Sequence, residues 1–321
     1  IRKYFKDFKD PTLLYQRIIT EIKYFAELYL WLRTSYENEY LIYNKMLDQN
    51  QQYLLILSCV TYDDINKGSK INDIAKKFDL MHTLLRLMNV YESTKFQRII
   101  YPLNKDIRNQ EPENAVNIFD DMLIKTLEDE EAIARGEIKS VEEIFTFERF
   151  KGISNKWTNF SKYVLMRIDR YLSKLLDEKP SYTWIALTEL EERFNKTTRR
   201  KLGMHLEHIY AWNESNMAQF TVDGKFDDDL FNTERNKLGM VLLLKDRQNI
   251  SSGNEIYTDK IETYKTSNFI WNELLTGHLH SIDLREIPDD LRVNIILPNE
   301  SGSFPKKEIE NRQRLVFNAI K

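Results

Sequence analysis

Apolar residues in the first half of the chain recur with the spacing of helices. From Pro11 onward they return every three or four residues and share one helical face: Leu14, Ile18, Ile22, Phe25 and Tyr29. Pro11 suits a first helical turn, where its missing N–H costs nothing. A second such face lies within 155–176, at Trp157, Phe160, Val164, Ile168, Leu172 and Leu175. Further helices are predicted around 37–60, 72–90, 92–108, 113–135 and 140–150.

The pattern changes after the polar segment 177–181, Asp-Glu-Lys-Pro-Ser, which is the best boundary signal in the chain. Beyond it, strands are predicted at 205–211 and 238–244, separated by a long polar loop. Helical spacing then returns at three places: 257–266, 269–275 and 306–320.

These patterns predict a mainly α protein of two domains. A multi-helical platform over 1–180 would be followed by an α+β domain over 181–321. The order strand, loop, strand and helix in the second domain is the order of a ββα metal finger.

Composition narrows the class of protein. With 42% hydrophobic and 12% aromatic residues, the chain is too apolar for a disordered protein. Its mean hydropathy is −0.54, and no apolar run approaches the roughly 20 residues that cross a bilayer. The single cysteine, Cys59, lies in an apolar stretch and is interpreted as a buried, unreactive thiol, which fits a reducing cytoplasm. The net charge of −3 means that a nucleic acid would have to be held by a local basic patch.

Most of the candidate chemistry lies in one short run, His205-Leu206-Glu207-His208. A zinc-protease helix needs His-Glu-x-x-His, and the spacing here does not match it. The neighbouring residues favour a strand instead, so Glu207 and His208 reach the same site only where that strand ends. His82 is interpreted as structural, and His278 and His280 carry only a weak expectation of phosphate contact.

The chain from about residue 200 resembles the C-terminal HNH domain of GmrSD-type modification-dependent restriction endonucleases. The residues that carry the resemblance are Glu207-His208-Ile209-Tyr210, then Arg235-Asn236-Lys237-Leu238-Gly239-Met240-Val241-Leu242-Leu243-Leu244, Asn249, Tyr257, Lys260, Tyr264 and Ser267, and the tail pair Ile309 and Arg312.

The resemblance implies a metal-dependent DNA endonuclease that acts against phage. His208 would be the general base. Glu207 and Asn249 would hold one divalent cation, Mg²⁺ or Mn²⁺, since hard ions prefer oxygen ligands. Lys260 would contact phosphate, and Asn236 would brace the loop that aims His208. The role of His205 is left open.

Basic residues stand where DNA would be bound. They precede the motif or surround its second half: Arg199, Arg200, Lys201, Arg235, Lys245 and Arg247. Contacts of this kind give affinity without sequence preference. For any one of them a solvated turn is an equally good interpretation.

Two positions depart from the family pattern. Met240 stands where the family commonly has Asn, and Ala211 stands where Pro commonly follows. The ParB-like, nucleotide-binding domain that normally comes first in this family is expected outside this chain, because its Asp-Gly-Gln-Gln-Arg hallmark is not found. The alternative hypothesis is a non-catalytic helical module whose degenerate finger binds DNA or a partner protein.

Overall fold

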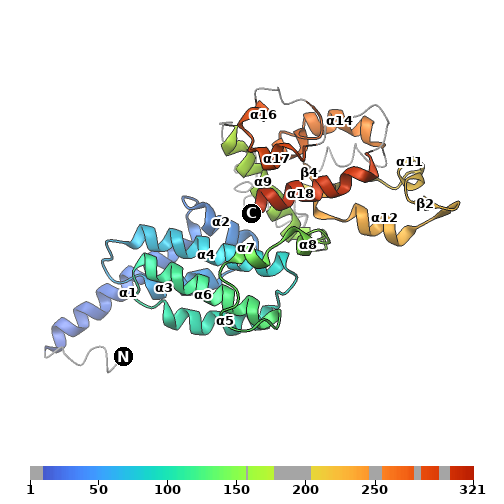
Figure 1. The fold of residues 1–321 in the computed structure, drawn as a ribbon. Helices are drawn as coiled ribbons and strands as arrows, with labels where there is room; N and C mark the ends of the chain where they lie inside the picture. Colours follow the sequence, from blue (N-terminus) through green and yellow to red (C-terminus); the bar gives the residue numbers. More distant parts are fainter. Residues whose placement is uncertain (1–9, 157, 177–203, 246–254, 278–282, 296–303) are drawn as a thin grey trace. The chain divides into compact units, whose positions relative to one another are not determined.

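The computed structural model describes residues 10–156, 158–176, 204–245, 255–277, 283–295 and 304–321. Its contacts divide into two compact units, Ile1–Phe145 and Thr146–Lys321, and each is described by itself. The described residues are mainly helical, as the sequence predicts (Figure 1). No helix in these ranges is both long enough and apolar enough to span a membrane.

The first unit consists of helices in the described part of the chain: α1 (Pro11–Thr34), α2 (Glu39–Met46), α3 (Gln51–Cys59), α4 (Lys67–Leu87), α5 (Ser93–Asp106), α6 (Pro112–Glu130) and α7 (Val141–Ile144). The single helix predicted over 37–60 is two helices, because Asp48 between them adopts the left-handed conformation with φ of 56°. Helix α4 packs against α2, α3 and α6 and carries much of the apolar core.

Several polar side chains in the described part of the first unit are buried in structural roles. The ring of His82 packs edge-on against Tyr91, with its Nε2 atom 2.9 Å from Arg86 Nε. Burial and the Arg86 charge lower the pKa of His82 to about 3. Burial raises the pKa of the Cys59 thiol to about 11, which agrees with an unreactive cysteine. Lys70 forms a buried ion pair with Asp64, at 2.8 Å.

The second unit combines short helices with small sheets. Its described elements are α8 (Phe147–Phe150), α9 (Thr158–Leu175), β1 (Met204–His208), α11 (Glu214–Ala218), β2 (Thr221–Val222), β3 (Lys225–Phe226), α12 (Asp228–Arg235), η1 (Leu238–Met240), β4 (Val241–Lys245), α14 (Tyr257–Lys265), α15 (Ile270–Glu273), α16 (Asp283–Glu286), α17 (Asp289–Arg292), η2 (Lys306–Glu308) and α18 (Ile309–Ile320).

The two predicted strands form an antiparallel pair. Strands β1 and β4 are hydrogen-bonded with His208 opposite Val241 and Met204 opposite Lys245. β1 ends at His208 rather than at residue 211, and β4 begins only at Val241 because the residues before it form the 3₁₀ turn η1. Helix α14 is the next described element after β4, beyond residues 246–254, which lie outside the described ranges. The ββα metal finger itself stays a prediction.

The segment between the two strands is not the long loop that the sequence analysis expected. It contains α11, the β2–β3 hairpin and α12. Asn213 caps α11 and Asp227 caps α12, each by accepting a backbone N–H bond at 2.9 Å. Asp223 and Gly224 adopt positive φ and form the hairpin turn. The polar residues interpreted as loop are therefore the caps and the turn of short elements.

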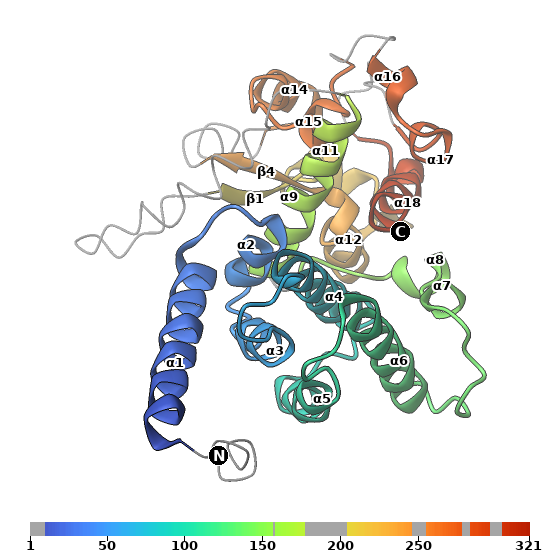
Figure 2. The same cartoon turned by 90° about the vertical axis from the view of Figure 1, so that its left-hand side faces the viewer.

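Helix α9 packs against β1 and β4, and Figure 2 shows it beside the strand pair. It also contacts α15 and α18. The contacts therefore divide the chain before α8, whereas the boundary signal at 177–181 lies outside the described residues. The division of the protein into domains at residue 180 stays a prediction.

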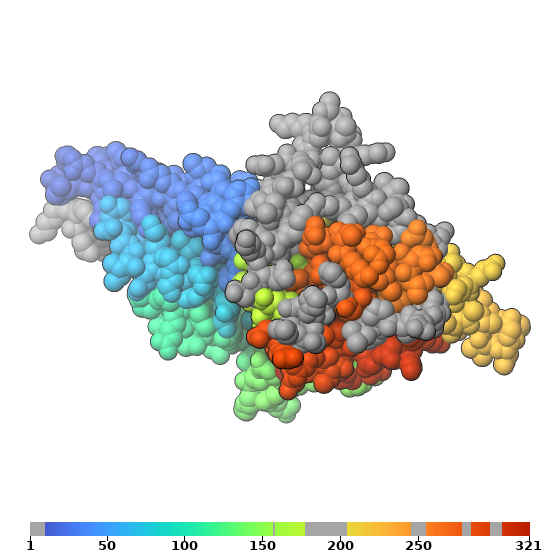
Figure 3. Space-filling model, turned by 90° about the horizontal axis from the view of Figure 1, so that it is seen from above, coloured from blue at the N-terminus to red at the C-terminus, as the bar shows by residue number. Residues whose placement is uncertain are grey.

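The C-terminal helix α18 approaches η1 closely. A Cβ atom at Gly239 would lie 2.8 Å from the backbone of Arg312, so only glycine fits there. On the face drawn in Figure 3, the orange residues of α14 and α15 lie next to the red residues of the C-terminal helices.

Candidate functional site

His208 lies at the end of β1, where the regular strand stops. Its Nε2 atom is 3.0 Å from Oδ1 of Asn236, the C-cap residue that follows α12. The same Nε2 atom is 3.0 Å from Nδ2 of Asn155. The structure thus brings together His208 and Asn236, which the sequence analysis singled out, and adds Asn155, which it did not.

The surroundings of His208 favour a neutral ring. Burial, followed by the nearby charge of Arg235, lowers the pKa of His208 to about 4. The hydrogen bond to Asn236 opposes this shift, while the charge of Lys260 adds to it. At neutral pH the imidazole therefore retains a lone pair that can accept a proton.

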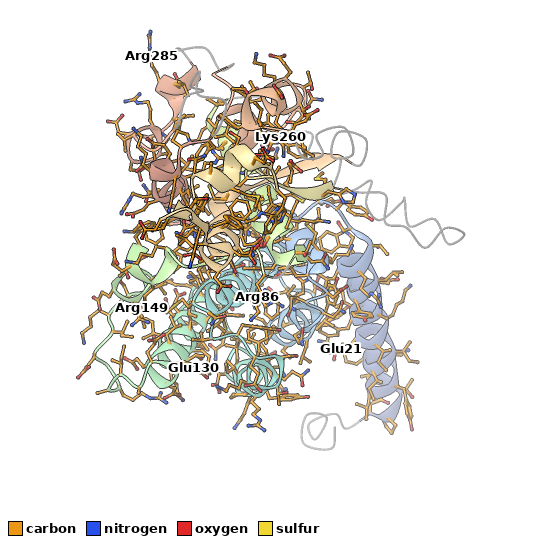
Figure 4. The ribbon with its side chains drawn as sticks, turned by 90° about the vertical axis from the view of Figure 1, so that its right-hand side faces the viewer. Glu21, Arg86, Glu130, Arg149, Lys260 and Arg285 are labelled. Atoms are coloured by element: carbon orange, nitrogen blue, oxygen red, sulfur yellow. The ribbon has the colours of Figure 1, made fainter. Side chains whose placement is uncertain are left out.

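Glu207 and Lys260 form a buried ion pair beside this histidine. Lys260 is 0% exposed and Glu207 is 8% exposed, and the Lys260 ammonium group donates to Oε1 of Glu207. It also donates to the backbone oxygen of His208, at 3.2 Å. Figure 4 labels Lys260 among the side chains of this unit. In this structure Lys260 therefore ties α14 to the end of β1 and does not face a surface that DNA could reach; its predicted phosphate contact stays untested.

The side chain of Arg235 contacts the backbone and an aromatic ring of its own unit. Its Nε atom donates to the backbone oxygen of Tyr210, at 3.1 Å. Its guanidinium carbon lies 5.6 Å from the ring centroid of Trp212. Burial lowers the pKa of Arg235, and the charge of Glu207 opposes that shift. Arg235 thus adds positive charge next to His208 from a partly buried position.

Side chains of helix α15 bond the backbone of β4, the strand paired with β1. The indole N–H of Trp271 donates to the Val241 oxygen at 3.2 Å, and Asn272 donates to the Leu243 oxygen at 2.7 Å. Arg312 of α18 lies 3.9 Å from the Trp271 ring centroid, at cation–π distance. Because Val241 is the partner of His208 in the register, these contacts also fix the end of β1.

Several residues singled out in the sequence cannot be placed. Asn249 lies outside the described residues, as do four of the basic residues: Arg199, Arg200, Lys201 and Arg247. For Lys245 only the backbone, at the end of β4, is described. Within the described ranges, no three His, Cys, Asp or Glu residues gather as a metal site would require. His205 is partly buried on β1 opposite Leu244, and its role stays open.

A comparison with protein-family models adds a direct finding. Residues 138–318 match the model described as the GmrSD restriction endonucleases, C-terminal domain. The chain belongs to the GmrSD restriction endonuclease family. Searches of the curated proteins and of the solved structures found no significant match.

The GmrSD match begins at residue 138, well before residue 200, where the motifs that resemble the family begin. It includes α9, which packs against the strand pair, and α8, which contacts α18 in the same unit. No motif in this stretch points to it. Its place in the domain is visible only from packing: α9 covers both strands, and the segment before α9 supplies Asn155.

The two departures from the GmrSD pattern are accommodated by the backbone. Met240 is buried, and its carbonyl oxygen accepts the Ile209 N–H at 3.0 Å. Ala211 is also buried, and its oxygen accepts a bond from Asn216 Nδ2 at 2.9 Å. Both are structural positions, and neither side chain supplies a polar group.

Proposed function

We propose that this chain is the DNA-cutting part of a GmrSD-type restriction system that acts against phage in the bacterial cytoplasm. The activity is hydrolysis of phosphodiester bonds by an HNH-type endonuclease. The observation that carries the proposal is the placement of His208: a neutral imidazole at a strand end, held at Nε2 by Asn236, directly after Glu207 in the chain.

Phosphodiester hydrolysis needs a group that removes a proton from water. Within the described residues Nδ1 of His208 makes no hydrogen bond, while Nε2 is held by amides. Nδ1 is thus the atom that takes the proton when Nε2 carries its own. The hydroxide formed attacks phosphorus and the 3′ oxygen leaves. General-base help of this kind contributes typically about 10²–10⁴-fold to the rate.

The oxygen donors that the resemblance assigns to this site suit a hard divalent cation. Glu207 supplies a carboxylate at the end of β1, and Asn249 would supply an amide oxygen. Mg²⁺ commonly binds one or two carboxylates and keeps water and substrate phosphate as its other ligands. When bound, such a cation supplies Lewis-acid polarisation of the phosphate. Glu207 already binds Lys260, so its carboxylate would have to serve the ammonium group and the cation together.

The substrate and partner follow from the family. DNA would be the substrate, bound through basic residues that include Arg235 and those near residue 200. Recognition of modified phage DNA would fall to a ParB-like, nucleotide-binding domain that acts with this chain, or to the helical region of the chain itself. That assignment is separate from the chemistry at His208.

The experiment is a cleavage assay with purified protein, Mg²⁺ or Mn²⁺, and plasmid or phage DNA, modified and unmodified. We expect nicked or linear product from the wild type, loss of at least about a hundredfold in His208→Ala, and loss with EDTA. Asn232→Leu, in α12, should retain activity, because Asn232 bonds Asp228 and not His208. Intact DNA from the wild type with either metal, indistinguishable from His208→Ala, would overturn the proposal.

One observation favours the alternative of a finger that binds without cutting. The Glu207 carboxylate is engaged by a fully buried Lys260, which competes with a cation for the same oxygen. A protein of this kind would retain DNA in the presence of EDTA and leave it uncut. The same assay, combined with a mobility shift measurement, separates the two functions.

A further inference from the structure

The side chain of Asn155 reaches His208 from a part of the sequence with no motif. Asn155 precedes α9 and is separated from His208 by 53 positions in the chain. Its Nδ2 atom lies 3.0 Å from His208 Nε2, the same distance as Asn236 Oδ1. Two amides therefore meet on a single ring nitrogen.

The backbone around Asn155 is fixed by pairing with the segment that carries Asn236. Asn155 N–H donates to the Asn236 oxygen at 2.7 Å, and Leu238 N–H donates to the Ile153 oxygen at 3.1 Å. Ser154 and Lys237 form an antiparallel bridge between these bonds. The two amides are thus carried by backbones that are bonded to each other.

Helix α18 fixes this pairing from a third direction. Gln313, which is buried, donates to the Ile153 oxygen at 2.9 Å and accepts the Gly239 N–H at 2.8 Å. One side chain therefore connects both paired segments. Asn155 is thus held by backbone bonds to the segment of Asn236 and, through Gln313, by α18.

The tautomer of the His208 ring decides which of the two amides bonds its Nε2 atom. A single ring nitrogen cannot donate to Asn236 and accept from Asn155 at the same time. One amide is therefore bonded in each tautomer of the ring: Asn155 when Nε2 carries the lone pair, and Asn236 when Nε2 carries the hydrogen. An amide can also turn its oxygen or its nitrogen toward the ring, since its terminal torsion is two-fold. The ring therefore has a partner in either tautomer, and in the catalytic one, with Nε2 protonated, an Asn155 amide turned to present its oxygen shares that hydrogen with Asn236.

We propose that Asn155 is a positioning residue for His208: with Asn236 it holds Nε2 so that Nδ1 stays directed at the reacting water. Asn155 itself touches neither substrate nor water. The inference rests on the proposed function of His208 for its effect on catalysis, but the placement of the ring is testable without any activity.

The test compares Asn155→Leu, which removes the amide at similar size, with Asn155→Asp, which keeps an acceptor for an Nε2–H. Asn232→Leu is the matched control, because Asn232 bonds Asp228 within α12 and does not bond His208. We expect kcat of Asn155→Leu to fall about five- to tenfold with KM within about twofold, since a lost hydrogen bond is worth about 1 kcal/mol. Asn155→Asp should recover most of kcat, and Asn232→Leu should match the wild type.

Crystal structures of the same variants give the second measurement. In Asn155→Leu we expect the His208 ring to turn away from Asn236 or to occupy two orientations, whereas Asn155→Asp keeps one. An unchanged ring together with an unchanged kcat in Asn155→Leu overturns the inference. If the wild type does not cut DNA, the proposed function fails, but the ring orientation still decides whether Asn155 positions His208.

Discussion

Each compact unit buries a lysine–carboxylate pair, and the two pairs have different consequences. In the first unit Lys70 binds Asp64, six residues away in sequence, and the pair closes the turn before α4. In the second unit Lys260 binds Glu207, 53 residues away, and the pair joins α14 to the end of β1. The first pair stabilises a local turn, whereas the second fixes one element of the candidate site against another.

The other hydrogen-bond partners of the two ion pairs show where each pair acts. Asp64 also accepts the backbone N–H groups of Thr61 and Asn66, each at 2.9 Å. Burial alone would raise the pKa of Asp64, but the bonds from Lys70 and from these N–H groups outweigh it and lower the pKa to about 2. Each lysine also donates to a backbone oxygen at 3.2 Å: Lys70 to that of Cys59, in the first unit, and Lys260 to that of His208. A change at Lys260 therefore reaches the site directly.

The largest effect is expected for Lys260→Met. Removing one partner of a buried ion pair typically costs about 3–5 kcal/mol. The second unit should lose that much stability, and DNA cutting should be lost as well. Hydrogen exchange of the β1 and β4 amides, measured beside the cleavage assay, checks both. The double variant Glu207→Leu with Lys260→Met should recover most of the stability but none of the cutting. If the double variant cuts DNA, the pair has no role in the site.

A smaller effect is expected for Lys70→Met in the first unit. Asp64 keeps its backbone N–H partners there, so the free energy of unfolding should fall by about 2–3 kcal/mol, less than for Lys260→Met. Denaturant unfolding followed by exchange of α3 and α4 amides measures this loss. DNA cutting at a temperature where the first unit stays folded should be unchanged. A loss of cutting under that condition would contradict the contrast between the two pairs.

The smallest effect is a pH dependence from His82. Its pKa is lowered from 6.5 to about 3 in the folded protein, so its contribution to stability is complete above pH 6.5. As the pH falls below 6.5, the unfolded chain takes up a proton that the folded chain does not. The free energy of unfolding should fall by about 1.4 kcal/mol per pH unit, or about 2 kcal/mol at pH 5. Urea unfolding at pH 7 and pH 5 measures this, and His82→Gln, compared over the same range, should have a flatter slope.

Much of the fold is visible in the sequence because its signals are local. The apolar spacing predicts α1, α4, α5, α6 and α9, and the strand residues predict the β1–β4 pair. The misjudged parts are short elements whose polar caps resemble loop residues, such as Asn213 and Asp227. The break between α2 and α3 depends on one backbone torsion at Asp48, which composition does not reveal.

The candidate site divides in the same way. Glu207, His208 and Asn236 were found because they lie in motifs. The structure bonds His208 to Asn236, and Lys260 connects the Glu207 carboxylate to the backbone oxygen of His208. The burial of Lys260 was not foreseen, because a lysine in a polar helix is ordinarily exposed. Asn155 was interpreted only as part of a helical segment, since its partner is 53 positions away and contacts of that range leave no periodicity in the sequence.

The packing of α9 and of the segment before it bears on how such a nuclease could be exchanged between proteins in evolution. A recombination breakpoint near residue 180 would separate the strand pair from α9 and from Asn155, both of which contact it. A breakpoint before α8 would move all of these together. The segment that recombination must move intact is therefore longer than the catalytic motif. It begins before α8, upstream of every residue of the motif.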